Sequence, residues 1–150
     1  MSEVNYDVLK LKNQLCFPLY ACSREVIKQY KPFLDQVDLT YTQYIAMLAL
    51  WEHREMTVKE LGDALYLDSG TLTPLLKKLE NKGYVTRTRS RKDERNLIVA
   101  VTDAGDALKD QALKMHQEIA LYTEMPKDAA AVLYRALYDI LGRLDITNAD

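Results

Sequence analysis

Cysteine and histidine are scarce in this sequence of 150 residues, which holds two of each. Neither histidine has a second ligand at the spacing of a zinc motif, and the cysteines do not form a CxxC pair. His53 falls near the expected end of a helix, where a positive imidazole is favourable. We therefore expect no metal and no bound cofactor.

Long apolar runs and catalytic signatures are also missing. No apolar run approaches the roughly 18–20 residues that span a bilayer. The start, MSEVNYDVLK, has neither the basic nor the apolar part of an export signal. There is no glycine-rich phosphate loop and no GxSxG motif. We expect a cytoplasmic protein that does not associate with membranes, is not an enzyme and keeps its thiols reduced.

The length and composition predict one domain over residues 1–150, because 48% hydrophobic and 28% charged residues are typical of a soluble domain of this size. The net charge is −2, yet residues 77–95 hold eight basic and three acidic side chains. A positive patch on an acidic protein indicates a surface directed at a polyanion. A solvated charged loop is the commoner meaning of such a run.

Apolar spacing predicts helices at both ends of the chain. Intervals of three and four predict a long helix over 7–30, which Pro32 ends. Two apolar stripes on this helix indicate burial on two sides. Similar stripes predict helices after Thr102 and after Pro126. We expect these terminal helices, about 7–31 and 103–145, to form a dimer interface.

The middle of the chain matches a winged helix. TYTQ (40–43) and TVKE (57–60) are capping boxes that mark helix starts. Another helix, starting near Thr71 to accommodate Pro74, completes a helix-turn-helix. YVTRTRS and NLIVAVT around RKDER then predict a basic hairpin. The predicted fold is mainly α with a small β-hairpin wing: a winged helix-turn-helix, DNA-binding over about 57–101, with N- and C-terminal dimerisation helices.

Hydroxyls and basic groups on the second helix and the hairpin suit base edges and phosphates. The candidate DNA-binding residues are Ser69, Thr71, Thr73, Lys77, Lys78, Arg87 and Arg95.

Both cysteines lie on the first predicted helix. Six residues along a helix would separate the Cα atoms of Cys16 and Cys22 by roughly 10 Å, which is too far for a disulfide. Cys22 lies on the main apolar stripe, so we expect core or interface packing. Cys16 lies one turn before Tyr20, whose phenol could hydrogen-bond a thiolate. Taken alone, the residues favour a buried, inert Cys16.

A resemblance changes that balance. It is carried by LKNQLCFPLYACSRE, KQYKPFLDQVDLTYTQY, LWEH, LYLDSGTLTPLLKKLENKGYVTR and KDERNLIVAVTDAG. From about Leu9 to Leu144 the chain resembles MarR-family regulators, and specifically the organic-hydroperoxide-sensing repressors of the OhrR type. The DER wing is common to MarR proteins, whereas the cysteine of NQLC together with YLDSGTLTPLL is specific to the narrower group.

The resemblance implies a role for each site residue. Cys16 would be the peroxidatic thiol, with Tyr20, Tyr30 and Tyr41 as its hydrogen-bonding tyrosines. Tyr30 comes 14 residues after Cys16, or about 21 Å along a helix, so it could reach the thiol only from another element, such as the partner subunit.

At the wing, Arg95 would be the minor-groove arginine and Asp93 would hold it in place. Two features depart from the family pattern. Pro18 removes the amide that would bond to Gln14, so a kink is expected beside the thiol. The C-terminal half has no resolving cysteine, which resembles the one-cysteine type that needs an external thiol.

These observations predict a homodimeric repressor that binds an inverted-repeat operator in double-stranded DNA. An organic hydroperoxide would oxidise Cys16, a low-molecular-weight thiol would cap it, and the operator would be released. The nearest alternative is a MarR-type repressor that binds a small aromatic ligand without thiol chemistry. A thiol peroxidase would have no use for a basic wing, and a helical adaptor would not explain the capping boxes and wing together.

Overall fold

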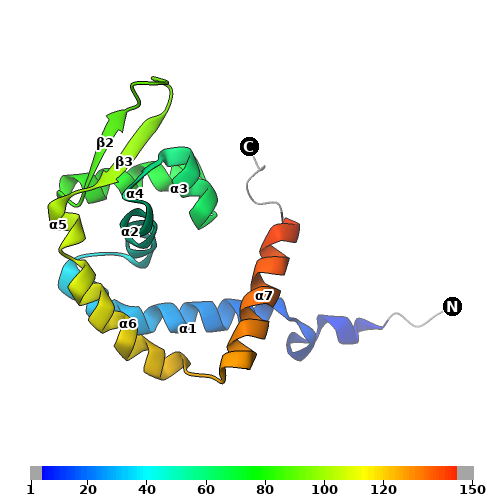
Figure 1. Cartoon of the computed structure of the whole chain (residues 1–150). Helices are drawn as coiled ribbons and strands as arrows, with labels where there is room; N and C mark the ends of the chain where they lie inside the picture. The colour runs from blue at the N-terminus through cyan, green and yellow to red at the C-terminus, as the bar shows by residue number, and fades with distance from the viewer. Residues whose placement is uncertain (1–4, 145–150) are drawn as a thin grey trace.

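The computed structural model describes residues 5–144 and is mainly helical (Figure 1). The ends of the predicted domain 1–150 and of the predicted helical segment 103–145 lie outside the described residues. In chain order the α-helices are α1 (Cys16–Leu34), α2 (Tyr41–His53), α3 (Val58–Leu65), α4 (Ser69–Asn81), α5 (Asp103–Asp106), α6 (Lys109–Thr123) and α7 (Lys127–Leu144). The strands are β1 (Glu55–Thr57), β2 (Val85–Arg89) and β3 (Leu97–Val101), and the 3-10 helices are η1 (Tyr6–Leu9), η2 (Leu11–Asn13) and η3 (Asp35–Val37).

Both predicted capping boxes are confirmed. The Thr40 hydroxyl accepts the Gln43 amide proton at 3.2 Å, and the Gln43 side chain accepts the Thr40 amide proton at 3.0 Å. Thr57 and Glu60 exchange the equivalent bonds at the start of α3. These side chains satisfy amides that have no partner within the helix, so they fix where α2 and α3 begin.

Helix α4 begins at Ser69, before the predicted Thr71, because Asp68 caps it and accepts the Thr71 amide proton at 2.8 Å. Pro74 therefore lies beyond the first turn, and the bond to the Gly70 carbonyl is lost. The inward face of α4 offsets this loss, since Leu72 and three further leucines on that face are buried.

The predicted hairpin is confirmed as β2 and β3, and it is joined by a third strand that the sequence pattern did not reveal. The antiparallel order is β1-β3-β2, with Val99 of β3 paired to Met56 on one side and Arg87 on the other. Strand β1 has three residues, too few for an alternating pattern to be recognised.

Helices α2–α4 and the sheet form a compact head around one apolar core. Its largest fully buried side chains are Met47, Leu50, Leu61, Leu72, Leu76, Leu79, Val85 and Val99. Every helix of the head contributes to this list, so α4 is packed tightly against its neighbours.

Helix α1 starts at Cys16, so the predicted start at residue 7 is wrong. The Asn13 side-chain amide donates to the Asp7 carbonyl at 2.7 Å, and the Gln14 side chain donates to the Val8 carbonyl. These bonds occupy carbonyls that a continuous α-helix would use, so two 3-10 turns precede α1 instead.

Two other predicted helix limits are corrected. Helix α1 continues through Pro32 to Leu34, because the buried Leu34 and half-buried Phe33 anchor its last turn in the core. The helix after Thr102 is broken in two. Thr102 caps the short α5, and α6 starts anew at Lys109.

Helices α1, α6 and α7 extend beyond the head, although Leu34 of α1 and Met115 and Ile119 of α6 join its core. Figure 1 shows α1 and α6 below it, with α7 continuing from the end of α6 at a distance from α2. Among the described residues of α7 none is buried. No helix in the described part of the chain is long and apolar enough to cross a bilayer.

Candidate redox site and DNA-binding face

Cys16 is the first residue of α1, and its side chain is exposed and not in a disulfide. The expectation of a buried, inert Cys16 is therefore wrong for the single chain. Pro18 falls in the first turn, where its missing amide would have no helical partner. Pro18 therefore removes no hydrogen bond within α1, and the loss on which the expected kink was based does not occur.

Tyr20 lies one turn after Cys16 on α1, and the residue is 60% exposed. The Arg24 guanidinium lies 5.3 Å from the centre of this ring, a cation–π distance. The Cys16 thiol and the Tyr20 phenol thus both lie near the N-terminus of α1, where both residues are exposed.

Cys22 is also exposed and not in a disulfide. Packing in the core of the chain, one of the two expectations for Cys22, is therefore wrong. Packing in an interface stays a prediction. The geometric exclusion of a Cys16–Cys22 disulfide within one helix agrees with the free state of both thiols.

Tyr30 and Tyr41 meet at the other end of α1. Their ring centroids are 5.1 Å apart in an edge-on arrangement. Tyr44 completes the cluster, with its ring centroid 5.8 Å from that of Tyr30 and 6.2 Å from that of Tyr41. Sequence reasoning missed Tyr44 as part of the site, although its position three residues after Tyr41 places both on one face of α2.

Burial changes the ionisation of this tyrosine cluster. Removal from water raises the pKa of Tyr30 and of Tyr41, and the neighbouring Tyr41 adds to the effect at Tyr30. Burial also raises the pKa of Tyr44 to about 12. All three phenols therefore stay protonated at neutral pH and can donate hydrogen bonds.

The four predicted redox residues do not come together within one chain. Cys16 and Tyr20 occupy the start of α1, whereas Tyr30 lies about 21 Å from Cys16 along the helix axis. Tyr41 packs with Tyr30 at that far end. The structure thus groups the predicted site into two halves at opposite ends of α1.

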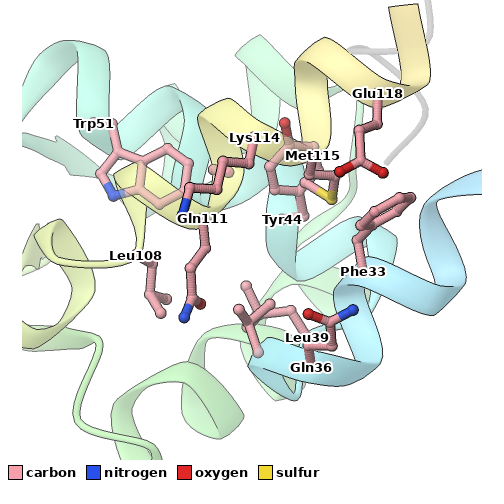
Figure 2. A pocket seen from close by; sticks show the side chains of 12 residues that line it. Phe33, Gln36, Leu39, Tyr44, Trp51, Leu108, Gln111, Lys114, Met115 and Glu118 are labelled. Atoms are coloured by element: carbon pink, nitrogen blue, oxygen red, sulfur yellow. The ribbon is translucent and has the colours of Figure 1, made fainter. Parts of the chain in front are cut away.

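A cavity of about 300 Å³ adjoins the tyrosine cluster between α1, α2 and α6. Figure 2 shows Tyr44, Trp51 and Phe33 around it, with Met115 of α6 and Leu108, the residue before α6. Glutamine, lysine and glutamate side chains line part of its edge. Apolar rings with a few polar groups are typical of a site for a small organic molecule.

The outer face of α4 is exposed as predicted. It carries the side chains of Ser69, Thr71, Thr73, Lys77 and Lys78. Thr71 is engaged locally, since its hydroxyl donates to the Asp68 carboxylate at 2.9 Å.

Arg87 differs from the other candidate DNA-binding residues. Its side chain is 20% exposed, and the guanidinium forms a 2.6 Å ion pair with Glu80 of α4. A second bond from its Nε to the same oxygen measures 2.9 Å. Arg87 thus ties strand β2 to α4.

The wing tip carries Arg95, which is exposed. Asp93 supports the turn by accepting the Arg95 backbone amide proton at 3.1 Å and a proton of the Asn96 side-chain amide at 3.4 Å. Within residues 5–144 no ion pair joins the Asp93 carboxylate to the Arg95 guanidinium. Asp93 therefore contacts Arg95 through the backbone of the turn.

Metal ligands do not cluster in the described part of the chain. No group of three or more histidine, cysteine, aspartate or glutamate side chains is arranged there to hold a metal ion.

Sequence comparisons place the chain among bacterial regulators. The family described as "Transcriptional regulator SarA/Rot" matches residues 28–112. The organic hydroperoxide resistance transcriptional regulator of Bacillus subtilis (strain 168) is 48% identical over 146 residues, covering 97% of this chain and 99% of that protein. The regulator SarZ of Staphylococcus saprophyticus is 45% identical over 133 residues, covering 89% and 91% of the two chains.

Structural similarity agrees with these matches. The crystal structure of AbfR of Staphylococcus epidermidis has a TM-score of 0.77 at 36% identity and covers 91% of this chain and 94% of that one. Reduced AbfR bound to DNA has a TM-score of 0.76 at 36% identity, with 91% and 95% covered. The chain therefore belongs to the MarR/SarA-type family of winged-helix transcriptional regulators, and within it to the organic hydroperoxide resistance type.

Proposed function

We propose that the protein is a homodimeric repressor that senses organic hydroperoxides through Cys16 and then releases its operator. The observation that carries this proposal is the division of the redox residues between the two ends of α1. Cys16 and Tyr20 can meet Tyr30 and Tyr41 only if a second protomer brings its own α1 alongside in the opposite direction. The site is thus incomplete without a partner.

Exposed apolar side chains support the dimer. They lie on the segment before α1, on α1 itself and on α6 and α7, and a monomer rarely exposes so much apolar surface. They include Leu9, Leu15, Tyr20, Leu113, Leu121, Tyr122, Val132, Tyr134 and Leu144. Segments 7–31 and 103–145 would form this interface, and 57–101 would bind DNA.

The chemistry begins at the Cys16 sulfur. Its thiolate attacks the terminal oxygen of a hydroperoxide, so an S–O bond forms and the O–O bond breaks. The alcohol leaves after taking a proton, and Cys16 becomes a sulfenic acid. A low-molecular-weight thiol then condenses with the sulfenic acid, which forms a disulfide and water.

Oxidation would change the contacts of the thiol. The anionic sulfur accepts hydrogen bonds from the phenols of Tyr20, Tyr30 and Tyr41, whereas a capped sulfur carries no charge and has a bulky substituent. These bonds then weaken, the two protomers shift and the spacing of the reading heads changes.

DNA binding would use α4 and the wing of each head. Hydroxyls and lysines on α4 would face one major groove, and Arg95 would enter the adjacent minor groove. Two heads related by two-fold symmetry would read an inverted repeat whose half-sites lie about 34 Å apart. No turnover is needed for this function, so we propose a regulator that is not an enzyme.

The cavity beside Tyr44 favours one alternative function, regulation by a small aromatic ligand without thiol chemistry. The two functions differ in their need for Cys16. A thiol peroxidase would differ from both by oxidising a thiol donor catalytically.

Operator binding before and after oxidation tests the proposal. The DNA would be an inverted repeat selected from a randomised library by the reduced protein, and the oxidant would be cumene hydroperoxide with a small thiol. Wild type and the matched control Cys22→Ser should release the DNA, whereas Cys16→Ser should stay bound. Release that persists in Cys16→Ser would contradict thiol sensing and favour the small-ligand alternative.

A further inference from the structure

Tyr44 extends the tyrosine cluster toward the head. Its side chain is 5% exposed and contacts Tyr30 and Tyr41 on one side. On its other side the ring meets Trp51 edge-on, with centroids 6.4 Å apart. Tyr44 and Trp51 lie seven residues apart on α2, so they share one face of that helix.

Trp51 links this face of α2 to α5. Its indole Nε1 donates to the Gly105 carbonyl at 3.0 Å. Gly105 is buried, and a Cβ at this position would collide with the backbone carbonyl of Tyr84. Helix α5 therefore contacts the backbone of Tyr84, just before strand β2, directly. The indole hydrogen bond holds the Gly105 carbonyl in this position.

A second set of bonds ties α5 to the end of α2 and to the residues just before strand β2. The Arg54 guanidinium, at the end of α2, pairs with the Asp106 carboxylate at 2.5 Å. The Thr102 hydroxyl donates to the Gly83 carbonyl at 2.6 Å, and the Thr102 amide donates to the Tyr84 carbonyl at 3.0 Å. Helix α5 is thus a joint between the end of α2, the root of the wing and the start of α6.

We propose that Tyr44 and Trp51 are positioning residues that couple the state of the redox site to the orientation of the joint and wing, an inference that rests on the proposed function. When Tyr30 and Tyr41 lose their bonds to the thiolate, their rings repack against Tyr44. Close-packed rings move together, so the displacement reaches Trp51 and, through its bond to Gly105, the base of the wing.

The surroundings of the two rings permit this movement. Both line the cavity of about 300 Å³ beside α6 (Figure 2). Either ring can therefore shift toward the cavity. On the opposite side, Tyr44 is held by the rings of Tyr30 and Tyr41, and Trp51 is held by its hydrogen bond to α5.

Trp51→Phe tests the coupling, because it keeps an aromatic ring and deletes the indole donor. The measured quantity is the ratio of operator dissociation constants for fully oxidised and reduced protein. Allosteric coupling is typically about 5- to 150-fold, and we expect Trp51→Phe to lower the wild-type ratio by about 5-fold or more. The rate of Cys16 oxidation and the affinity of the reduced protein should stay near wild type. Tyr44→Phe keeps the packing ring and should retain the wild-type ratio, whereas Tyr44→Leu should lower it.

The results distinguish coupling between the redox site and the wing from a purely structural role of the two rings. An unchanged ratio in Trp51→Phe and Tyr44→Leu would overturn the inference. So would an equal loss of affinity in the reduced and oxidised states, because Trp51 would then only stabilise the head. If wild type itself kept its affinity after complete oxidation of Cys16, the proposed function would fail first.

Trp51 also offers a test without substitution, since it is the sole tryptophan of the chain. Its fluorescence should change when wild type or Cys22→Ser is oxidised, and should stay constant in Cys16→Ser. This measurement decides the question even if Trp51→Phe does not fold. Constant emission in wild type that has been oxidised and has released DNA would overturn the inference.

Discussion

At the scale of single residues, the phenols owe their proposed role to burial. Removal from water favours the neutral form of Tyr30 and Tyr41 and raises the pKa of each. A neutral phenol donates a hydrogen bond that stabilises an anionic sulfur, and charge-assisted bonds of this kind are stronger than neutral ones.

The first prediction concerns these donors. Tyr30→Phe and Tyr41→Phe delete one hydroxyl each and keep the ring, so the packing of the cluster should survive. A lost charge-assisted bond of about 1.5 kcal/mol should slow the reaction of Cys16 with cumene hydroperoxide by about 10-fold. Stopped-flow measurement of sulfenic acid formation reports this rate.

Tyr66→Phe is the matched control, since Tyr66 caps the C-terminus of α3 in the head. It should react at the wild-type rate. Equal rates in all four proteins would show that the Tyr30 and Tyr41 hydroxyls do not act on the thiol.

At the scale of elements, local signals predicted the head well. Capping boxes fixed the starts of α2 and α3, and alternation around a charged turn predicted the hairpin. The start of α1 was not predictable from periodicity, because side-chain bonds from Asn13 and Gln14 to preceding carbonyls replace the helical pattern. Strand β1 and the break before α6 depend on tertiary contacts, which leave no periodic signal.

The candidate site was predicted through resemblance more than through pattern. The cysteine and three tyrosines could be named from matching stretches, but the pattern alone favoured an inert thiol. The roles of Tyr44 and Trp51 needed the structure, because apolar spacing marks them only as inward-facing residues of α2.

The second prediction concerns Arg87, which is bound to Glu80 and so is poorly placed to contact DNA freely. If the pair sets the wing angle, Glu80→Gln should weaken operator binding, and Arg87→Ala should weaken it similarly. If Arg87 instead contacts a phosphate, releasing it in Glu80→Gln should strengthen binding. Dissociation constants of the reduced proteins at one salt concentration separate the two outcomes.

The third prediction concerns the cap of α4. The amide and hydroxyl of Thr71 hold the pKa of Asp68 below its ordinary value of 3.8. Because the folded pKa is the lower one, Asp68 contributes stability that is full above 3.8 and is lost as the pH falls through the folded value. Asp68→Asn keeps an acceptor for the cap and removes the titration.

Urea unfolding between about pH 6 and pH 3 checks this prediction, since ordinary carboxyl groups titrate in the lower part of that range. The free energy of unfolding should fall less steeply below about pH 4 in Asp68→Asn than in wild type. Parallel curves would show that the cap does not depend on the charge of Asp68.

At the scale of the whole molecule, the head and the outer helices differ in how well their apolar side chains are buried. The head has a buried core that α1 and α6 help to cover, whereas α7 buries nothing among its described residues and the start of α1 is exposed. Dimerisation would cover these apolar faces and would join the two halves of the redox site in one step. Peroxide sensing and control of the spacing between heads would then share one interface.

The central claim is that each redox site is built from two protomers, and a mixed dimer tests it most directly. One protomer carries Cys16→Ser and the other Tyr30→Phe, and two affinity tags isolate the mixed species. Across the interface, the single remaining Cys16 then faces an intact Tyr30. We predict that this thiol reacts with cumene hydroperoxide at the wild-type rate, while the Tyr30→Phe homodimer reacts slowly. A mixed dimer as slow as the Tyr30→Phe homodimer would place Tyr30 and Cys16 in the same protomer's site and contradict the account.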